Sequence, residues 1–492
     1  MLDKTLKYTQ YAFFGIFGIL LSVGFLRGCF FINEQGVPFA LAIVLFAVLL
    51  AITLGGIKLY RFLSKKYANI SKRQSNIILF FLCITVFLLQ IICSVILKTE
   101  HPLPPDLHII DECSKILAKD FNPENLKTIL SVTTPQGYTY EQELWKYLQY
   151  YPINIPLICI LTACYKIGFS PILLNTLFLF GTYLLTCLTA KKVYSDNFKP
   201  LAVAVTAAFF PVFYGYTTIY YTDTMSVFWV ILGIYFVICG MSSKKKNIIF
   251  WVLSALSLSI GFMIKASVGI ILPAVLIWLV CKIKDIGYKK VLSYGLVFVI
   301  CFMIFTKCFS FASAQTGINT EESKYEYQFP KLHWVMMGLG GQGGFSQADN
   351  RATRGAGNYD EKLEYDKTEL KKRLSEYNPI TFLKFAFWEK ATRTWFDGTY
   401  FINQGYLKNK FFNSKLFVVL STLLQLLLFF GILLSFYEGA RSGRKDFTLL
   451  FRIALCGIFL FLLVWETRSR YLINFTPFIL LLLPSLGVKL KE

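Results

Sequence analysis

The sequence predicts an all-α polytopic membrane protein, a bundle with about 11 to 13 transmembrane helices. Only 16% of the 492 residues are charged and 55% are hydrophobic, whereas a soluble domain carries about a quarter charged residues. Apolar runs of about twenty residues recur along the chain. These runs are continuous instead of alternating, and this favours helices over the strands of a membrane barrel.

The formal net charge of +21 arises mainly from Lys and Arg in the short loops between apolar runs. In a soluble protein such an excess would suggest a nucleic-acid partner. Here the basic residues mark cytoplasmic loops, so the expected partner is the lipid bilayer of the cell membrane and no nucleic acid is expected. Almost all of the 12 Cys lie inside apolar runs without a CxxC pair, which predicts neither a disulfide framework nor a metal cluster.

Four basic loops set the predicted topology, and all four can be cytoplasmic at once: 58–73, 244–246, 282–290 and 441–445. Both termini are then cytoplasmic, and two long polar segments face the outside. The expected helices are 12–32, 37–61, 76–98, 200–218, 223–241, 248–264, 268–281, 291–308, 415–436, 449–465 and 471–487. The first run is too long for a signal peptide, so it is expected to stay as a first transmembrane helix.

One stretch does not fit this topology simply. Residues 152–190 are long enough for two spans, whereas the predicted topology needs an odd number of membrane crossings there. Either part of the stretch is re-entrant, or the small basic loop at Lys191 and Lys192 breaks the positive-inside rule.

Four segments are expected along the chain. They are two additional N-terminal helices (1–75), a membrane core with the first outer loop at 99–151 (76–308), an outer lid segment (309–414) and C-terminal transmembrane helices (415–492). The lid contains the run GLGGQGGF, 338–345, and a helical pattern at 360–376. The glycine run matches no Walker motif and follows no strand, so it is interpreted as a flexible outer loop near a ligand and not as a nucleotide cradle.

The candidate acids lie on the outer side. Prolines 102, 104 and 105 exclude a helix, so Asp106 is predicted to be the N-cap of a short amphipathic helix. The apolar face of that helix recurs at Leu107, Ile110, Ser114 and Leu117. Asp106 is either only a cap or a general base at the membrane interface, with Asp111 and Glu112 as rivals. Asp223, in YYTDT, is likewise either a cap or a further catalytic acid.

Three cations stand at the outer ends of apolar runs: Lys265, Arg468 and Arg470. The positive-inside rule does not place them there, and a cation in such a position usually has an anionic partner. Together they could bind a phosphate or diphosphate. The alternative is pairing with Glu466 and ordinary positions at the lipid interface.

No cofactor is expected from the sequence. His101 and His108 are seven residues apart, but with only three His in the chain a histidine-based metal site is not predicted. A divalent cation held by carboxylates stays open as an alternative.

Five strings stand in a characteristic order from about residue 76 onward: PPDLHIIDECSKIL, YYPINIPL, TAKKVYSDNFKPLAVAVTAAFFPVFYGYTTIYYTDT, IKASVGIILP and ETRSRYLINFTPFI. In this order they resemble the polyprenyl-phosphate-sugar-dependent glycosyltransferases of the GT-C fold, specifically the bacterial protein-mannosyltransferase-like (GT39-type) membrane proteins. The resemblance departs from the family in two places. Tyr150–Tyr151 stand where a second acid is frequent, and the two helices before residue 76 are additional to the common core.

The resemblance implies a function. Such enzymes take a sugar from a polyprenyl-phosphate carrier on the outer face and transfer it, with inversion, to a hydroxyl of a glycan, lipid or protein of the cell envelope. It implies that Asp106 is the catalytic acid of the first loop and that Lys265 contacts the carrier phosphate. It also places Arg468 and Arg470 where a phosphate-binding arginine is expected.

The chemistry of sugar transfer agrees with these residue types. Transfer needs a base for the acceptor proton and cations for the departing phosphate. A flippase for lipid-linked sugars is one alternative, but it would place polar groups along the bilayer midplane, and few charges lie inside the predicted spans. A non-catalytic scaffold of the same fold is the other alternative.

Overall fold

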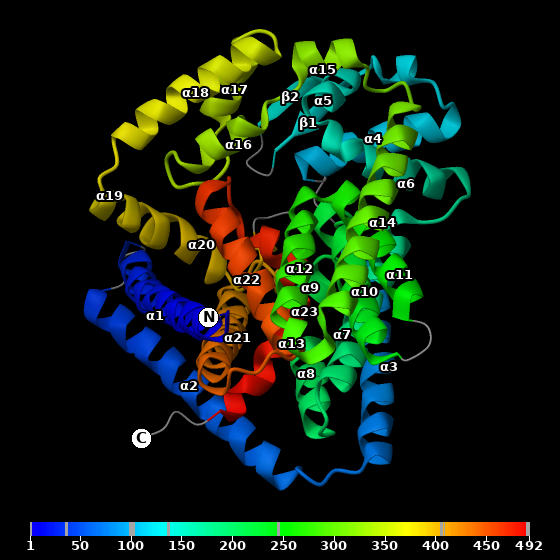
Figure 1. The fold of residues 1–492 in the computed structure, drawn as a ribbon. Coiled ribbons are helices and arrows are strands. Elements are labelled where there is room, and N and C mark those ends of the chain that lie inside the picture. Colours follow the sequence, from blue (N-terminus) through cyan, green and yellow to red (C-terminus); the bar gives the residue numbers. More distant parts are fainter. Residues whose placement is uncertain are drawn as a thin grey trace.

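The computed structural model describes residues 2–34, 38–97, 104–134, 138–243, 247–403, 407 and 409–488. In these ranges the chain is almost entirely helical, with one two-stranded hairpin (Figure 1). Ten of the described helices are long and apolar enough to cross a membrane, and three shorter apolar helices accompany them. The predicted all-α membrane class is therefore confirmed.

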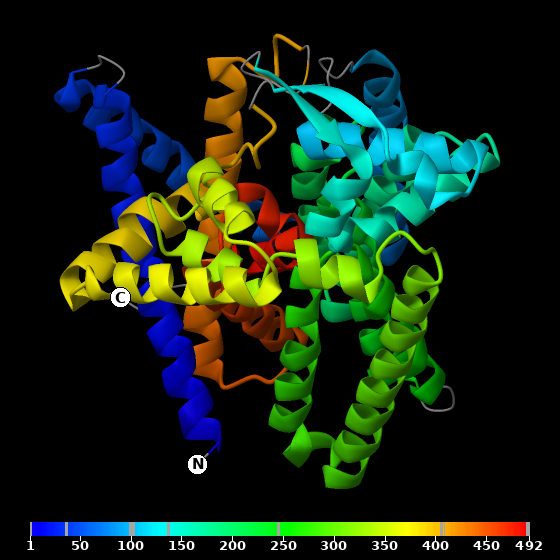
Figure 2. The same ribbon diagram turned by 90° about the horizontal axis from the view of Figure 1, so that it is seen from above.

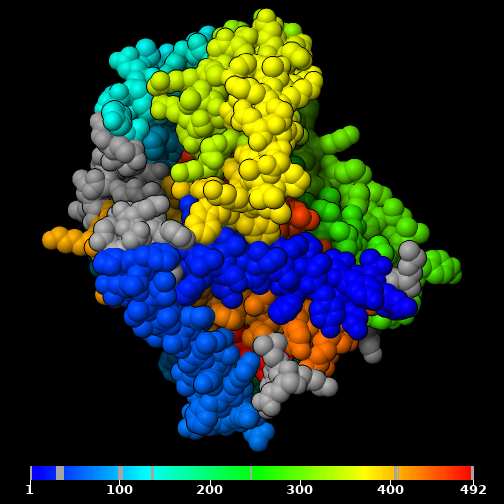
Figure 3. Space-filling model, turned by 90° about the vertical axis from the view of Figure 1, so that its left-hand side faces the viewer, coloured from blue at the N-terminus to red at the C-terminus, as the bar shows by residue number. Residues whose placement is uncertain are grey.

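The N-terminal helices α1 (Leu2–Glu34) and α2 (Phe39–Lys66) run along one side of the molecule (Figure 3). They pack on α21 (Lys415–Ser442) near the other end of the sequence. The ring of Phe17 lies 5.6 Å from that of Phe429 and 5.4 Å from that of Phe436. Next, α3 (Lys72–Ile96) begins at a capping box between Ser71 and Gln74.

The first outer loop begins with α4 (Pro105–Lys119), whose predicted apolar face is buried. The predicted cap is wrong, because Pro104 is the N-cap residue and Asp106 lies inside the first turn. Proline suits the first helical position, since its missing N–H would have no partner there, and the helix therefore starts one residue before Asp106.

The rest of this loop contains a β-hairpin that the sequence did not predict. The antiparallel strands pair Val132 with Tyr140. The elements in order are η1 (Pro123–Leu126), β1 (Ile129–Thr133), β2 (Thr139–Glu143), α5 (Leu144–Tyr150) and η2 (Pro152–Asn154).

Residues 152–190 contain one helix that is long enough to span a membrane, α7 (Pro171–Val193). The helix α6 (Ile155–Lys166) has only 12 residues, a length of about 18 Å. It packs on α4, where the hydroxyl of Thr162 donates to the carbonyl of Ser114 (3.4 Å). Lys191 near the end of α7 donates to Asn76 at the start of α3 (2.7 Å). A crossing by α7 alone would give the odd number that the predicted topology needs.

The predicted continuous helix over 200–218 is wrong. It divides into α8 (Phe198–Ala208) and α9 (Val212–Gly215), followed by irregular backbone up to α10 (Thr222–Ser242). Pro211 lacks the N–H that would continue α8. The amide of Asn175 donates to the carbonyls of Tyr216 (2.7 Å) and Thr217 (3.1 Å). Irregular backbone inside a membrane protein persists where protein groups satisfy it in this way.

Two further predicted spans, 268–281 and 471–487, begin with 3₁₀ turns at the same end of the bundle. Lys265 lies between α11 (Asn247–Ile264) and η3 (Ala266–Ile270), between two apolar runs as predicted. The chain also breaks after α22 (Phe447–Val464), so that predicted helix 471–487 is composed of η5 (Ser469–Phe475), α23 (Thr476–Leu482) and η6 (Leu483–Gly487). Between these breaks run α12 (Ile271–Cys281), α13 (Ile283–Ile286) and α14 (Tyr288–Ala314).

The second outer segment is a row of short helices that confirms the helical pattern predicted at 360–376. The helices are α15 (Glu321–Tyr327), α16 (Lys331–Gly338), α17 (Gln347–Gly355), α18 (Tyr359–Ser375), α19 (Pro379–Leu383), a π-helical stretch (Lys384–Ala391) and α20 (Thr392–Trp395). Figures 1 and 2 show α15 beside α5. The amide of Gln149 donates to the carbonyl of Ile318 (2.7 Å), so the two outer segments share one side of the membrane.

Asp3 joins two of the basic loops that are predicted to be cytoplasmic. Its carboxylate lies 2.9 Å from Lys284 and 2.6 Å from Lys445. These contacts place the start of α1 on the same side as both loops. The basic loop at 244–246 and the C-terminal residues 489–492 lie outside the described residues.

The side assignment predicts a labelling pattern. Tyr138 and Ser375 are exposed in the two outer segments, and Ser442 is exposed in a basic loop. In intact cells, an impermeant maleimide should label Tyr138→Cys and Ser375→Cys, whereas Ser442→Cys should react only after permeabilisation. The unsubstituted protein controls for its own cysteines. The reverse pattern would invert the membrane orientation.

Candidate functional site

Asp106 is held by two tyrosines. One carboxylate oxygen accepts a hydrogen bond from the hydroxyl of Tyr147 (3.0 Å), and the other accepts one from Tyr221 (3.4 Å). The side chain is half-buried, and no Lys or Arg of the described ranges lies within ion-pair distance of it. The carboxylate is therefore oriented by its neighbours while keeping its negative charge available.

The two tyrosines act as permanent donors. Burial raises the pKa of Tyr147 and of Tyr221 well above the usual value, and the negative charge of Asp106 raises both further. Both hydroxyls consequently stay protonated at neutral pH. Tyr147 also accepts a hydrogen bond from Asn154 (3.2 Å), which fixes the position of its ring.

The two rival acids of the first loop have other partners. Asp111 is buried, lies 2.8 Å from Lys115 and accepts hydrogen bonds from Tyr220 (2.6 Å) and Tyr165. Glu112 faces outward and pairs with the same lysine at 2.7 Å. Asp111 thus links α4 to α6 and to the irregular backbone before α10, which is a structural arrangement.

Asp223 gathers two of the three predicted cations. It lies in the first turn of α10 with its side chain 2% exposed. One oxygen is 2.9 Å from the ammonium of Lys265, and the other is 3.7 Å from the guanidinium of Arg470. The anionic partner expected for Lys265 is therefore Asp223. One carboxylate between two cations leaves a net positive charge at this point.

Tyr221 connects this ion cluster to Asp106. Its hydroxyl donates to Asp106, and the guanidinium of Arg470 lies 5.0 Å from the centre of its ring. The ammonium of Lys265 lies 4.4 Å from the ring of Tyr471. The side chains of Lys265 and Arg470 remain 17% and 15% exposed, so that a ligand can reach them. A free carboxylate and a cationic cluster thus share one site.

Arg468 pairs with Glu466, which is the alternative to phosphate binding that the sequence left open. Its guanidinium lies 3.3 Å from Glu466, which also accepts a hydrogen bond from Tyr471 (2.6 Å). The guanidinium stands over the rings of Phe345 (5.4 Å) and Phe401 (5.5 Å). Arg468 therefore borders the site beside the glycine-rich run, with its charge already paired.

The glycine-rich run packs closely on the chain that leads to Arg468. A Cβ added at Gly338 would lie 2.5 Å from the backbone nitrogen of Glu466, so only glycine fits there. Gly343 has a φ of +75° and accepts a hydrogen bond from the backbone of Thr467 (2.9 Å). The ammonium of Lys390 holds this loop by donating hydrogen bonds to the carbonyls of Gly338 (2.6 Å) and Leu463 (3.0 Å).

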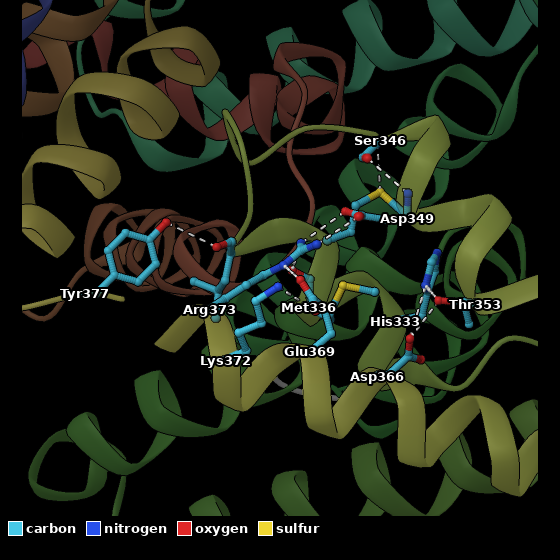
Figure 4. Close-up of polar contacts among 12 residues, drawn as sticks. His333, Met336, Ser346, Asp349, Thr353, Asp366, Glu369, Lys372, Arg373 and Tyr377 are labelled. Carbon is cyan, nitrogen blue, oxygen red and sulfur yellow. Dashed lines mark hydrogen bonds and ion pairs between the residues drawn. The ribbon is translucent and has the colours of Figure 1, made fainter. Parts of the chain in front are cut away.

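Ion pairs hold the lid helices together (Figure 4). Arg373 of α18 donates to both oxygens of Asp349 on α17 (2.8 and 3.1 Å) and to the carbonyl of Met336 on α16 (2.8 Å). The hydroxyl of Thr353 stands between His333 (2.9 Å) and Asp366 (2.8 Å), all three side chains being buried. The helices α16, α17 and α18 therefore form one unit.

The lid contributes site residues that the sequence did not reveal. Asn350 of α17 donates to the hydroxyl of Tyr151 (2.8 Å), and the guanidinium of Arg354 approaches the same hydroxyl (3.5 Å). Tyr151 in turn stacks near Tyr147. Nothing in the spacing of α17 signals this contact, because it joins residues about 200 positions apart in the chain.

No group of three or more His, Cys, Asp or Glu is placed to hold a metal ion within the part of the chain that the structure describes. His101 falls outside those ranges, so the structure does not test how His101 and His108 lie relative to each other.

These features define a polytopic integral membrane protein with a polar site where several of its helices break. A family model described as "Conserved hypothetical integral membrane protein" matches residues 138–489. The chain belongs to this family. No curated protein matches the sequence.

Solved structures with a similar arrangement include two of an oligosaccharyltransferase from Archaeoglobus fulgidus. AglB in complex with an inhibitory peptide and a dolichol-phosphate is 13% identical, with a TM-score of 0.45 over 86% of this chain and 50% of that chain. The apo form is 12% identical, with a TM-score of 0.42 over 85% and 51% of the two chains. The chain thus spans about half the length of these proteins.

The buried lysine beneath the glycine-rich run predicts a pH dependence of stability. Burial lowers the pKa of Lys390 to about 7 from its ordinary 10.5. Between these values the unfolded chain holds a proton that the folded protein has lost, so the free energy of unfolding rises with pH through this window. The Tm of the purified protein should rise from pH 7 to pH 9 more steeply than that of Lys390→Met. Parallel curves would contradict the lowered pKa.

Proposed function

We propose that this protein is a GT-C-type glycosyltransferase of the cell membrane that moves a sugar from a polyprenyl-phosphate-linked donor to a hydroxyl acceptor on the outer face. The main support is the single site shared by an unneutralised carboxylate, Asp106, and a cationic cluster, Lys265–Asp223–Arg470, with Tyr221 between them. A general base and a counter-charge for a leaving phosphate are the two groups that this transfer needs.

The proposed step is an inverting displacement. The acceptor oxygen forms a bond to the anomeric carbon while the bond between that carbon and the phosphate oxygen breaks. The electron pair leaves on the lipid phosphate, and the acceptor proton passes to Asp106. Tyr147 and Tyr221 keep the carboxylate turned toward the acceptor by donating one hydrogen bond to each oxygen.

The two exposed cations stabilise the departing phosphate. Charge that develops on the leaving oxygen is stabilised most by cations that are already in place. The buried carboxylate of Asp223 positions both cations, because it forms ion pairs with Lys265 and with Arg470. Arg468, which is paired with Glu466, has the smaller share in this role.

A cleft beside Lys265 fits a lipid-linked donor. Apolar residues from η2, α6, α11, η3 and α14 line it, among them Pro156, Phe262, Met263, Ala266 and Ala314, and Lys324 and Lys331 stand among its polar lining. Lys265 is outside this lining, but it directly precedes Ala266 in the chain, so a prenyl tail held in the cleft would lead toward the site from this side.

We expect Asp106→Asn to abolish sugar transfer. Asparagine keeps the shape of the side chain but cannot accept the acceptor proton, and a general base contributes typically about 10²–10⁴-fold. The measurement is turnover by the purified protein with synthetic polyprenyl-phosphate mannose, glucose and galactose as donors and with the mixed cell-envelope fraction as acceptor.

Three matched acids serve as comparisons for Asp106→Asn. Glu112→Gln should stay near wild-type turnover, because Glu112 faces outward. Asp111→Asn should lower the Tm, since it removes a buried partner of Lys115. Asp223→Asn should weaken donor binding through the two cations. Full turnover in Asp106→Asn would refute the assignment of the base.

The Lys265→Ala variant should lose transfer chiefly through the donor. A cation that stabilises a leaving phosphate in a water-poor site contributes about 3–4 kcal/mol, or roughly 10²–10³-fold in rate. Binding of polyprenyl-phosphate mannose and single-turnover rates measure the loss directly. Unchanged donor binding together with an unchanged rate would assign Lys265 only to pairing with Asp223.

A further inference from the structure

Arg354 on α17 is a cation that the protein leaves without a counter-charge. Its guanidinium stacks on the ring of Tyr150 at 4.2 Å and lies 3.5 Å from the hydroxyl of Tyr151. Its Nε is buried and has no hydrogen-bond partner. Across the described ranges, no carboxylate lies within ion-pair distance of it. A guanidinium held between an aromatic ring and a hydroxyl in this way is suited to bind an anionic oxygen group.

This cation is linked to Asp106 by a different route from the Lys265–Asp223–Arg470 cluster. The ring of Tyr151 is 4.9 Å from the ring of Tyr147, whose hydroxyl binds one oxygen of Asp106. The other oxygen binds Tyr221, which leads to Arg470. The two tyrosines therefore connect the carboxylate to two separate cationic positions, one on each of its oxygens.

Residues on either side of Arg354 in α17 have partners of their own, and Figure 4 shows those of Thr353 and Asp349. The neighbouring Thr353 is buried between His333 and Asp366, and Asp349 binds Arg373. Asn350, one turn before Arg354, donates to the hydroxyl of Tyr151 at 2.8 Å. The helix α17 therefore presents Arg354 and Asn350 to the site as a fixed pair, which lowers the entropy cost of binding a ligand there.

We propose that Arg354 and Asn350 bind an anionic group, a carboxylate or a phosphate, on the acceptor, so that the substrate class of the enzyme is an acidic glycan, lipid or peptide. This inference rests on the proposed function. An inverting displacement brings the acceptor to the sugar from the side opposite the leaving phosphate. Because the Lys265–Asp223–Arg470 cluster is assigned to the phosphate, we assign the second cation, which is linked to Asp106 through Tyr151 and Tyr147, to the acceptor.

The test uses two soluble probes that differ only in one carboxylate, methyl β-glucuronide and methyl β-glucoside. The purified full-length protein should bind the glucuronide roughly tenfold or more tightly than the glucoside, as expected for a charge-assisted hydrogen bond. Arg354→Gln should abolish this preference. Arg351→Gln is the matched control, because Arg351 is exposed one turn earlier on the same helix, and it should keep the preference.

A second variant separates charge from folding. Arg354→Lys keeps the positive charge but loses the planar fork, so it should retain part of the preference while Arg354→Gln loses all of it. Equal Tm values for the wild-type protein, Arg354→Gln and Arg354→Lys show that α17 stays folded. A preference that survives in Arg354→Gln, or that is missing from the wild-type protein, overturns the proposal.

Measurements of donor binding show whether the anionic group that Arg354 binds belongs to the acceptor or to the donor. Polyprenyl-phosphate mannose should bind Arg354→Gln as tightly as the wild-type protein, whereas Lys265→Ala should bind it more weakly. Weakened donor binding in Arg354→Gln would assign the anion to the donor and overturn the acceptor proposal. If the wild-type protein transfers no sugar from any donor but keeps the Arg354-dependent preference, the proposed function fails while an anion site at Arg354 stands.

Discussion

The buried carboxylate of Asp223 is the interaction on which the site depends. A charge near the lipid headgroups is costly unless a partner neutralises it. Lys265 and Arg470 come from two different helix breaks and meet on this one acid at the start of α10. The three broken segments can converge only because this ion cluster compensates the charges that the breaks bring together. An irregular backbone, which would be unfavourable in lipid, is thereby retained as part of a polar site.

The two outer segments contribute the remaining residues of the site. The helix α4 places Asp106 above the ion cluster, and the hairpin and α5 bring Tyr147 to its other side. The lid then closes this side with α17, which binds the hydroxyl of Tyr151. In the proposed mechanism this half-buried carboxylate is the base, and the two cationic positions bind the leaving phosphate and the incoming acceptor. The site therefore combines three groups of elements that are far apart in the sequence.

Much of the fold could be predicted because membrane insertion leaves few alternatives. Apolar runs of sufficient length must become helices, and the basic loops predicted a common side for the two polar segments, which the contact of Gln149 with Ile318 supports. The predictions that failed were local. Pro211 broke a predicted span, Pro105 moved a helix start by two residues, and a hairpin formed where no strand pattern had been recognised. The irregular backbone after Pro211 also depends on a distant group, because Asn175 binds its carbonyls.

The sequence by itself determined the membrane class, the helix positions and a short group of polar candidates, because hydrophobic length and charge placement are properties of local composition. Only the tertiary structure decided which candidates share a site. Asp106, Asp111 and Glu112 stand within two turns of one helix, yet only Asp106 is left without a cation. Arg354 carries no local signal at all. Partner choice depends on which side chains distant helices bring within a few ångströms, and composition does not record that distance.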